Sequence, residues 1–167
     1  MSQRDLHIAV YTGSFDPITL GHLNVIQRCS RLVDRLVIGI GVNIEKGSLF
    51  STDERMQLVE RVTAGLDNVE VKSFRGLAVN FVRDCGARVM IRGVRSLSDM
   101  EAEFTMSLAN QKLDPDVETV FLMAGEEYSH VSSSLIKQIA AMAGEEELLR
   151  FVPRPVAKAL REKLGSP

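Results

Sequence analysis

Short apolar segments rich in valine and isoleucine alternate along the chain with longer segments in which apolar residues recur at helical spacing. The short segments are the expected strands: Leu6–Tyr11, Leu36–Val42, Val69–Phe74, Val89–Ile91 and Val117–Met123. The longer segments are the expected helices: Gly21–Val33, Ser51–Leu66, Leu77–Cys85, Ser98–Leu113, Ser132–Ala143 and Pro153–Leu164. This alternation predicts an α/β fold, a Rossmann-like single domain over residues 1–167 whose five-stranded parallel sheet carries helices on both faces.

Several residues mark where the expected helices begin and end. The patterns Ser51–Glu54 and Ser98–Glu101 have the Ser-x-x-Glu form of a capping box, in which two side chains satisfy free N–H groups of the first turn. Gly86 and Gly144 follow two expected helices, at the position where glycine commonly ends a helix.

Polar and turn-forming residues follow each expected strand. They are Gly13–His22, Lys46, Gly76–Ala78, Arg92–Arg95 and Gly125–Ser134. In an open parallel sheet, ligands bind beyond the carboxyl ends of the strands, where the strand order reverses. We therefore expect these five segments to form the functional site.

The composition restricts where the protein acts and what it binds. A net charge of −2 provides no general attraction to nucleic acid or to an anionic membrane, so we expect neither as a partner. The two cysteines, Cys29 and Cys85, are isolated, which is typical of a reducing compartment. No apolar stretch has membrane-spanning length, and the first residues lack the pattern of a signal peptide. We expect a cytoplasmic protein.

The segment Tyr11–His22, YTGSFDPITLGH, contains the most informative pattern in the chain. Its Gly, Ser, Asp and Pro residues predict a loop, and helical spacing after it places His22 in the first turn of a helix. Free N–H groups there favour an anion. His22 alone could merely cap the helix, but Gly21 and Ser14 beside it favour a phosphate site, whereas Asp16 and its proline are expected to be turn residues.

Other nucleotide and metal motifs are absent from the sequence. Gly39 and Gly41 could begin a dinucleotide fingerprint, but Ile44 occupies the third glycine position and both glycines lie inside an expected strand. No GxxxxGK[ST] sequence occurs, which argues against a P-loop NTPase. The three histidines are too scattered for a metal-ligand motif, so no protein metal site is expected.

Thr19–His22 resembles the T/HxGH signature of a nucleotidylyltransferase superfamily, and the match extends over nearly the whole chain. It continues through LFSTDER, IRGVRSLSDMEAE, VFLM and SSSLIKQIA. Together these motifs resemble those of the bacterial phosphopantetheine adenylyltransferases. The resemblance implies an enzyme of coenzyme A biosynthesis that transfers the adenylyl group of ATP to 4′-phosphopantetheine and forms dephospho-coenzyme A and pyrophosphate.

The resemblance also implies roles for individual residues. The catalytic residues would be His22, which donates to the α-phosphate in the transition state, with Lys46 and Arg92. Contacts with ATP would come from Ser14, Phe15, His22, Gly93, Val94, Arg95, Glu103, Tyr128, Ser129, His130, Val131, Ser132, Ser133 and Ser134. Contacts with the acceptor substrate would come from Ser14, Lys46, Leu77, Ala78, Arg92, Met106 and Asn110.

The chemistry of this reaction suits the residues available. The attacking phosphate oxygen is already ionised at neutral pH, so the protein need only align two anions and stabilise the charge that develops. Gly93 is expected to turn the backbone so that Arg92 and Arg95 face one crevice. The resemblance implies Mg²⁺ bound mainly through ATP phosphates and a homohexamer built as a dimer of trimers.

Two other functions remain open at this point. One is a nucleotidylyltransferase of the same superfamily that acts on nicotinamide mononucleotide or a small alcohol phosphate. The other is a non-catalytic sensor of adenine nucleotides on the same fold. The presence of His22, Lys46, Arg92 and Arg95 argues against the sensor, because a protein that only binds has no need of a transition-state donor.

Overall fold

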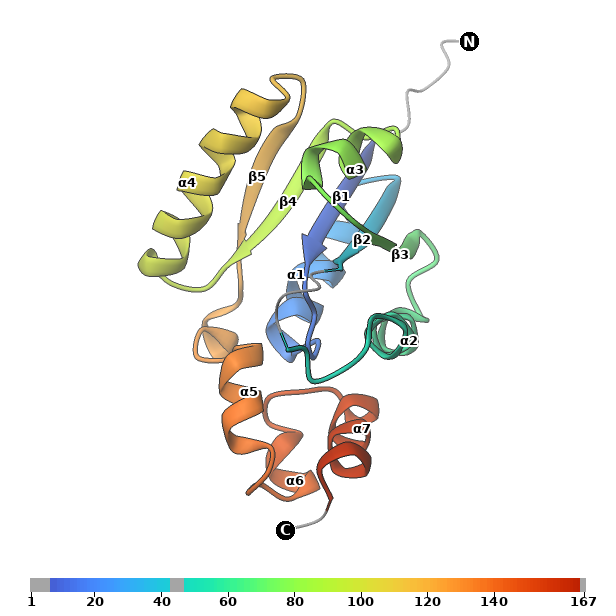
Figure 1. Cartoon of the computed structure of the whole chain (residues 1–167), viewed down its shortest axis with the longest axis vertical. Helices are drawn as coiled ribbons and strands as arrows, with labels where there is room; N and C mark the ends of the chain where they lie inside the picture. Colours follow the sequence, from blue (N-terminus) through green and yellow to red (C-terminus); the bar gives the residue numbers. More distant parts are fainter. Residues whose placement is uncertain (1–6, 43–46, 166–167) are drawn as a thin grey trace.

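A computed structural model of the chain describes residues 7–42 and 47–165. Five parallel strands form one sheet in the order β3-β2-β1-β4-β5, which confirms the expected parallel sheet (Figure 1). The strands are β1 (Ile8–Gly13), β2 (Arg35–Gly41), β3 (Val69–Phe74), β4 (Val89–Val94) and β5 (Glu118–Met123). From β1 the sheet continues through β2 to β3 on one side and through β4 to β5 on the other, so the strand order reverses between β1 and β4.

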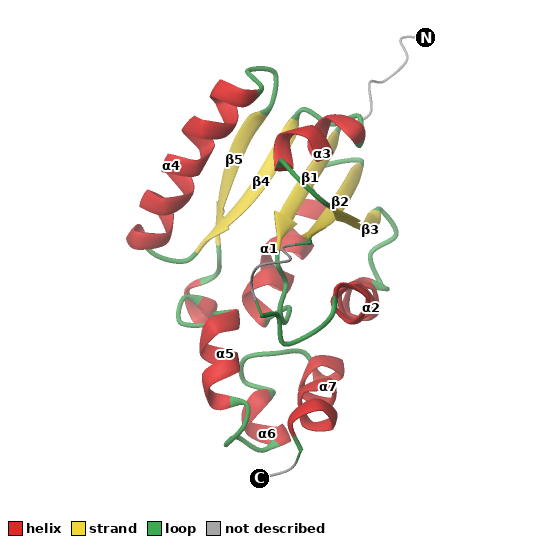
Figure 2. Cartoon of the chain, viewed as in Figure 1, coloured by secondary structure: helices red, strands yellow, loops and turns green. Residues whose placement is uncertain are grey.

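Helices connect the strands and follow the last of them (Figure 2). They are α1 (Leu20–Ser30), α2 (Thr52–Thr63), α3 (Ala78–Asp84), α4 (Leu97–Leu113), the 3₁₀ turn η1 (Glu126–Tyr128), α5 (Ser133–Ile139), α6 (Glu145–Leu148) and α7 (Arg154–Leu164). The helices α5, α6 and α7 gather beyond the carboxyl ends of the strands.

The central strands β1 and β2 are buried on both faces of the sheet, since successive residues of a strand point to opposite sides and both sides are covered. In β2, Leu36, Ile38 and Ile40 pack in a larger core with residues of α1, α2, α5, α6 and α7. Val37 belongs to a smaller core on the other face, together with Val10 and residues of α3. This two-sided burial explains why β1 and β2 appear in the sequence as continuous apolar runs.

The expected helix at Ser98 begins earlier, at Leu97, and the capping box expected for Ser98–Glu101 is wrong. Ser96 is the N-cap, and its side chain accepts a hydrogen bond from the N–H of Asp99. The Oγ of Ser98 lies 2.9 Å from the Oγ of Ser96. The capping box at Ser51–Glu54 is confirmed.

The expected helix Ser132–Ala143 is too long at its carboxyl end. α5 ends at Ile139, and Gly144 is the N-cap of the short helix α6 instead of the end of α5. The N–H of Gly144 donates to the Glu147 side chain at 2.9 Å. Because Ala143 in the intervening turn also packs against the core, helical spacing of apolar residues continued past the end of the helix. Gly86, in contrast, has φ +69 after α3, as expected of a terminating glycine.

Candidate active site

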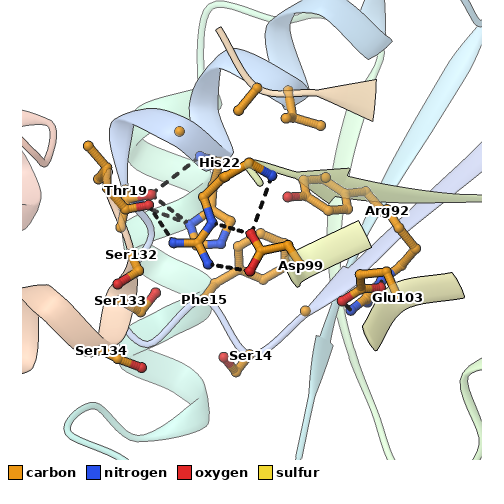
Figure 3. A pocket seen from close by; sticks show the side chains of 18 of the residues that line it. Ser14, Phe15, Thr19, His22, Arg92, Asp99, Glu103, Ser132, Ser133 and Ser134 are labelled. Carbon is orange, nitrogen blue, oxygen red and sulfur yellow. Dashed lines mark hydrogen bonds and ion pairs between the residues drawn. The ribbon is translucent and has the colours of Figure 1, made fainter. Parts of the chain in front are cut away.

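A pocket of about 300 Å³ opens at the point where the strand order reverses (Figure 3). It is lined by the end of β1 with the loop after it, the first turn of α1, the end of β4, the first turns of α4, and the segment that begins α5. The lining residues predicted to contact ATP are Ser14, Phe15, His22, Gly93, Arg95, Glu103, Val131, Ser132, Ser133 and Ser134. Arg92, predicted to be catalytic and to contact the acceptor, also lines the pocket. The structure thus brings together residues from three separate stretches of the chain, 14–22, 92–103 and 131–134.

His22 caps the start of α1, and its ring also lines the pocket. Thr19 is the N-cap of α1, and its Oγ1 accepts from the N–H of His22 at 3.3 Å. The N–H of Thr19 donates in return to Nδ1 of His22 at 3.1 Å, so the imidazole completes a capping box. Because Nδ1 accepts, the neutral ring carries its hydrogen on Nε2. The ring lines the pocket, and its Nε2–H remains for a ligand.

The surroundings keep this imidazole uncharged. Burial, followed by the positive charges of Arg95 and Arg92, lowers the pKa of His22 to about 4. The Phe15 ring packs edge-on against the imidazole with the ring centroids 5.1 Å apart. At neutral pH, His22 is therefore a neutral hydrogen-bond donor in a fixed orientation.

Arg92 fastens β4 to β1 and to α4. Its Nη1 donates to the carbonyl oxygen of Thr12 at 2.7 Å and lies 3.0 Å from that residue's Oγ1. Its Nε and Nη2 donate to the two carboxylate oxygens of Glu103. Although burial lowers the pKa of Arg92, the hydrogen bond and charge of Glu103 outweigh it, and the net pKa is raised. Arg92 is thus a held, permanently charged group in the pocket wall.

Arg95 is held in a similar way by Asp99, which lies one turn before Glu103 on α4. Its Nε and Nη2 donate to Asp99 at 2.8 and 3.1 Å, and its Nη1 donates to the carbonyl oxygen of Val131 at 2.8 Å. Among the described residues, the charged side chains that line the pocket are two arginines and two carboxylates. With His22 neutral, their formal charges cancel.

The expectation that Gly93 turns the backbone between the two arginines is wrong. Gly93 lies within β4 and makes no sharp turn between the arginines. A Cβ at this position would lie 2.8 Å from the Tyr11 hydroxyl and 3.2 Å from Val25. Glycine is needed there because β1 and α1 pack closely against it, and both arginines still line the same pocket.

The loop between β1 and α1 is tied to its surroundings at several points. The buried guanidinium of Arg55 donates to the carbonyl oxygen of Ser14 at 2.7 Å. Asp16 accepts from the N–H groups of Leu49 and Phe50 at 2.9 and 2.8 Å, and Lys137 lies 2.7 Å from its carboxylate. These contacts join β1, α2 and α5 around the pocket.

Two further features of this loop place side chains at the pocket. Phe15 has φ 47, an uncommon value for a residue other than glycine, and its ring is buried. The Oγ of Ser133 donates to the carbonyl oxygen of Pro17 at 2.8 Å, which attaches the start of α5 to the loop. With its contacts to Leu49, Phe50 and Lys137, Asp16 is a turn residue, as expected, and also connects this loop to the segment before α2 and to α5.

A second groove of about 530 Å³ adjoins the first pocket and shares five residues with it: Thr12, Gly13, Ser14, Arg92 and Glu103. Four residues predicted to contact the acceptor, Leu77, Ala78, Met106 and Asn110, line this groove with Ser14 and Arg92. Lys46, the remaining acceptor contact and predicted catalytic residue, lies outside the described residues.

Four residues predicted to contact ATP are not in the lining of the pocket. Val94 is fully buried in β4. Tyr128 lies behind the first turn of α1, since a Cβ on Gly21 would lie 3.6 Å from Cβ of Tyr128. Ser129 is exposed after η1, and the His130 ring packs edge-on against another aromatic ring.

Sequence reasoning did not single out several residues that shape the site. Thr12, Asp99 and Ala102 line the pocket, and Arg55 supports it from α2. Asp99 and Arg55 fall inside two of the motifs that carried the resemblance, SLSDMEAE and STDER, which was the available signal. The Asp99 partner is only 4 residues away in sequence, whereas Arg55 contacts a residue 41 positions away, a contact that only the folded structure shows.

Comparison with known proteins identifies the class first. Residues 10–139 match the model of the cytidylyltransferase-like family. The fold resembles that of a putative nicotinate-nucleotide adenylyltransferase from Vibrio parahaemolyticus, with a TM-score of 0.69, 15% identity, and coverage of 96% of this chain and 97% of that one. The chain is therefore a cytidylyltransferase-like nucleotidyltransferase with a Rossmann-like fold.

Within this class, two relatives define the particular family. A phosphopantetheine adenylyltransferase from Rhodopirellula baltica is 58% identical over 161 residues, which cover 96% of this chain and 90% of the relative. One from Clostridium botulinum is 52% identical over 157 residues, which cover 94% of each chain. The chain belongs to the phosphopantetheine adenylyltransferases.

Proposed function

We propose that the protein transfers the adenylyl group of ATP to 4′-phosphopantetheine, forming dephospho-coenzyme A and pyrophosphate. The observation that carries this proposal is the pair of adjoining cavities with Ser14 and Arg92 in their shared wall. The polar pocket with His22 suits a nucleotide, and the groove with Leu77 and Met106 suits a long, largely uncharged arm. Family membership supports the same assignment.

The reaction is a displacement at the α-phosphorus of ATP. A phosphate oxygen of the acceptor forms a bond to this phosphorus as the bond to the β-phosphate oxygen breaks, and pyrophosphate leaves. No side chain has to remove a proton, since the nucleophile is already ionised. The protein supplies alignment and fixed donors for the charge that develops.

Three described side chains would perform this work. The Nε2–H of His22 donates to a nonbridging oxygen of the α-phosphate, and its orientation is set by the bond from Thr19 to Nδ1. Arg92, in the shared wall, holds the acceptor phosphate beside the α-phosphate, with Ser14 nearby. Lys46 remains a predicted contact of the same phosphate.

We propose Mg-ATP as the form of the nucleotide that reacts. The two carboxylates of the pocket, Asp99 and Glu103, are both engaged by arginines. Within residues 7–42 and 47–165, no three His, Cys, Asp or Glu side chains form a group that could hold a metal ion. This donor set fits an ion that arrives on the phosphates and keeps water as its other ligands.

Pyrophosphate release with Mg-ATP and a panel of acceptors tests the assignment. We expect release with 4′-phosphopantetheine, and ATP synthesis when dephospho-coenzyme A and pyrophosphate are supplied. Release with nicotinamide mononucleotide in its place would assign the protein to another reaction of the same fold. Binding of ATP without release for any acceptor would favour the nucleotide sensor.

The assembly that we propose is a homohexamer formed as a dimer of trimers. It is supported by large apolar side chains that are exposed along α4 and β5: Leu97, Phe104, Met106, Leu108, Leu113, Val120 and Met123. β5 is also an edge strand of the sheet. Light scattering at micromolar concentration tests the assembly, and a monomer mass would exclude it.

A cytoplasmic location completes the proposal. The two cysteines are buried and unpaired, which suits a reducing compartment. In the described part of the chain, no helix is both long and apolar enough to cross a membrane.

A further inference from the structure

The guanidinium of Arg95 is held on one side by protein acceptors and open on the other. Nε and Nη2 donate to Asp99, and Nη1 donates to the carbonyl oxygen of Val131. The backbone N–H of Arg95 also donates to Asp99 at 3.3 Å. A guanidinium has five N–H groups, so these contacts leave one hydrogen on each Nη for a ligand in the pocket.

Asp99 is itself held in place by the start of α4. Its backbone N–H donates to the N-cap Ser96 at 3.2 Å, so the residue sits in the first helical turn. Its side chain is 27% exposed and that of Arg95 is 32% exposed, so water competes only partly for the pair. Through this pair and the bond to Val131, one guanidinium connects β4, α4 and the segment that begins α5.

A carboxylate in this position weakens the field that would attract a polyphosphate. With Asp99 and Glu103 ionised and His22 neutral, the charges of the described side chains in the lining cancel. Coulomb attraction alone would be greater without Asp99. Its presence is explained if the directions of the Arg95 donors matter more for nucleotide binding than the total charge of the wall.

We propose that Asp99 is a positioning residue for nucleotide binding, which acts by aiming the two free N–H groups of Arg95 at the phosphates of ATP. This inference rests on the proposed function for the identity of the nucleotide. It assigns Asp99 no contact with substrate and no part in the chemical step. The planar fork of arginine makes such aiming effective, since two parallel donors fit phosphate oxygens only in a narrow range of orientations.

The variant Asp99→Asn tests the proposal, because the amide keeps the size of the side chain but places an NH₂ group against the guanidinium. We expect the KM for ATP to rise about tenfold, with the KM for 4′-phosphopantetheine and the turnover changed less than about twofold. Asp99→Glu, which restores the charge, should recover part of the affinity. The exposed Glu101, in the same part of α4, provides the control Glu101→Gln, for which all three constants should stay at the wild-type values.

A double-mutant cycle with Arg95→Ala separates positioning from other roles. If Asp99 acts only through Arg95, Asp99→Asn should have no further effect on the KM for ATP in the Arg95→Ala background. An unchanged or lowered KM in the single variant, or an equal rise in both backgrounds, would overturn the proposal. Calorimetric titration with Mg-ATP repeats the cycle without turnover, so it tests Asp99 even if the wild-type protein releases no pyrophosphate. Absence of pyrophosphate release would count against the proposed function and not against the role of Asp99.

Discussion

Replacing His22 with alanine removes a capping contact that the structure shows and a ring N–H donor that lies in the pocket wall. The acceptor Nδ1, which binds the N–H of Thr19, stabilises the start of α1. The donor Nε2–H, which is left for a ligand in the pocket, is the group that we expect to stabilise the transition state. The two losses affect different quantities, so they can be measured separately.

The expected magnitudes follow from these two roles. Deleting one preorganised donor to a developing charge lowers turnover about 100- to 1000-fold, or roughly 3 to 4 kcal/mol. Loss of a helix cap lowers the free energy of unfolding by about 1 kcal/mol, which corresponds to a fall of roughly 2 to 4 °C in Tm for a chain of this size. The affinity for ATP should change far less than turnover, since the donor acts mainly on charge absent from the ground state.

The assay combines pyrophosphate release under saturating substrates, calorimetric titration with Mg-ATP, and thermal unfolding. Ser51→Ala is the control, because it removes the N-cap half of the capping box that begins α2, and Ser51 does not line the pocket. It should lower Tm by a similar amount and leave turnover unchanged. Near-normal turnover of His22→Ala would refute the reasoning and reduce His22 to a helix cap.

Three other outcomes follow from the structure. The unfolded chain binds a proton on His22 near pH 6.5, whereas the folded chain does so only near pH 4, so the free energy of unfolding should fall by up to roughly 3 kcal/mol as the pH drops through that window. Urea titrations should show this fall in the wild type and not in His22→Ala, and parallel dependence on pH in the two proteins would contradict it. Gly39→Ala places a Cβ 2.4 Å from a phenylalanine ring of α3 and should lower the free energy of unfolding by about 1 to 3 kcal/mol, whereas a Cβ at Gly65 meets no atom within 4 Å and Gly65→Ala should not lower it. Equal denaturation midpoints for the two variants would exclude this overpacking. Lys137→Ala removes the cation beside the buried Asp16 and should lower the free energy of unfolding by about 1 kcal/mol, and 1 M salt should reduce this difference from the wild type. Equal free energies of unfolding for the two proteins at low and high salt would show that water replaces the ion pair.

The sequence by itself determined the class of fold and the region of the site. Apolar runs separated by helical segments predicted five parallel strands, because burial on both faces leaves a local apolar pattern in the central strands of a sheet. The motif Thr19–His22 predicted a helix start beside a loop, since turn and capping preferences act over a few residues. Its resemblance to a known family supplied the expected reaction and the residues to look for.

Only the tertiary structure decided how these parts meet. Strand order placed β4 beside β1, which brought Arg92 and Arg95 next to His22. Other partners are far apart in sequence, such as Arg55 on the carbonyl oxygen of Ser14. The role of Gly93 depended on Tyr11 of the neighbouring strand. Such contacts arise from packing between elements, and a chain's local preferences carry little information about which distant residue will complete a hydrogen bond or fill a space.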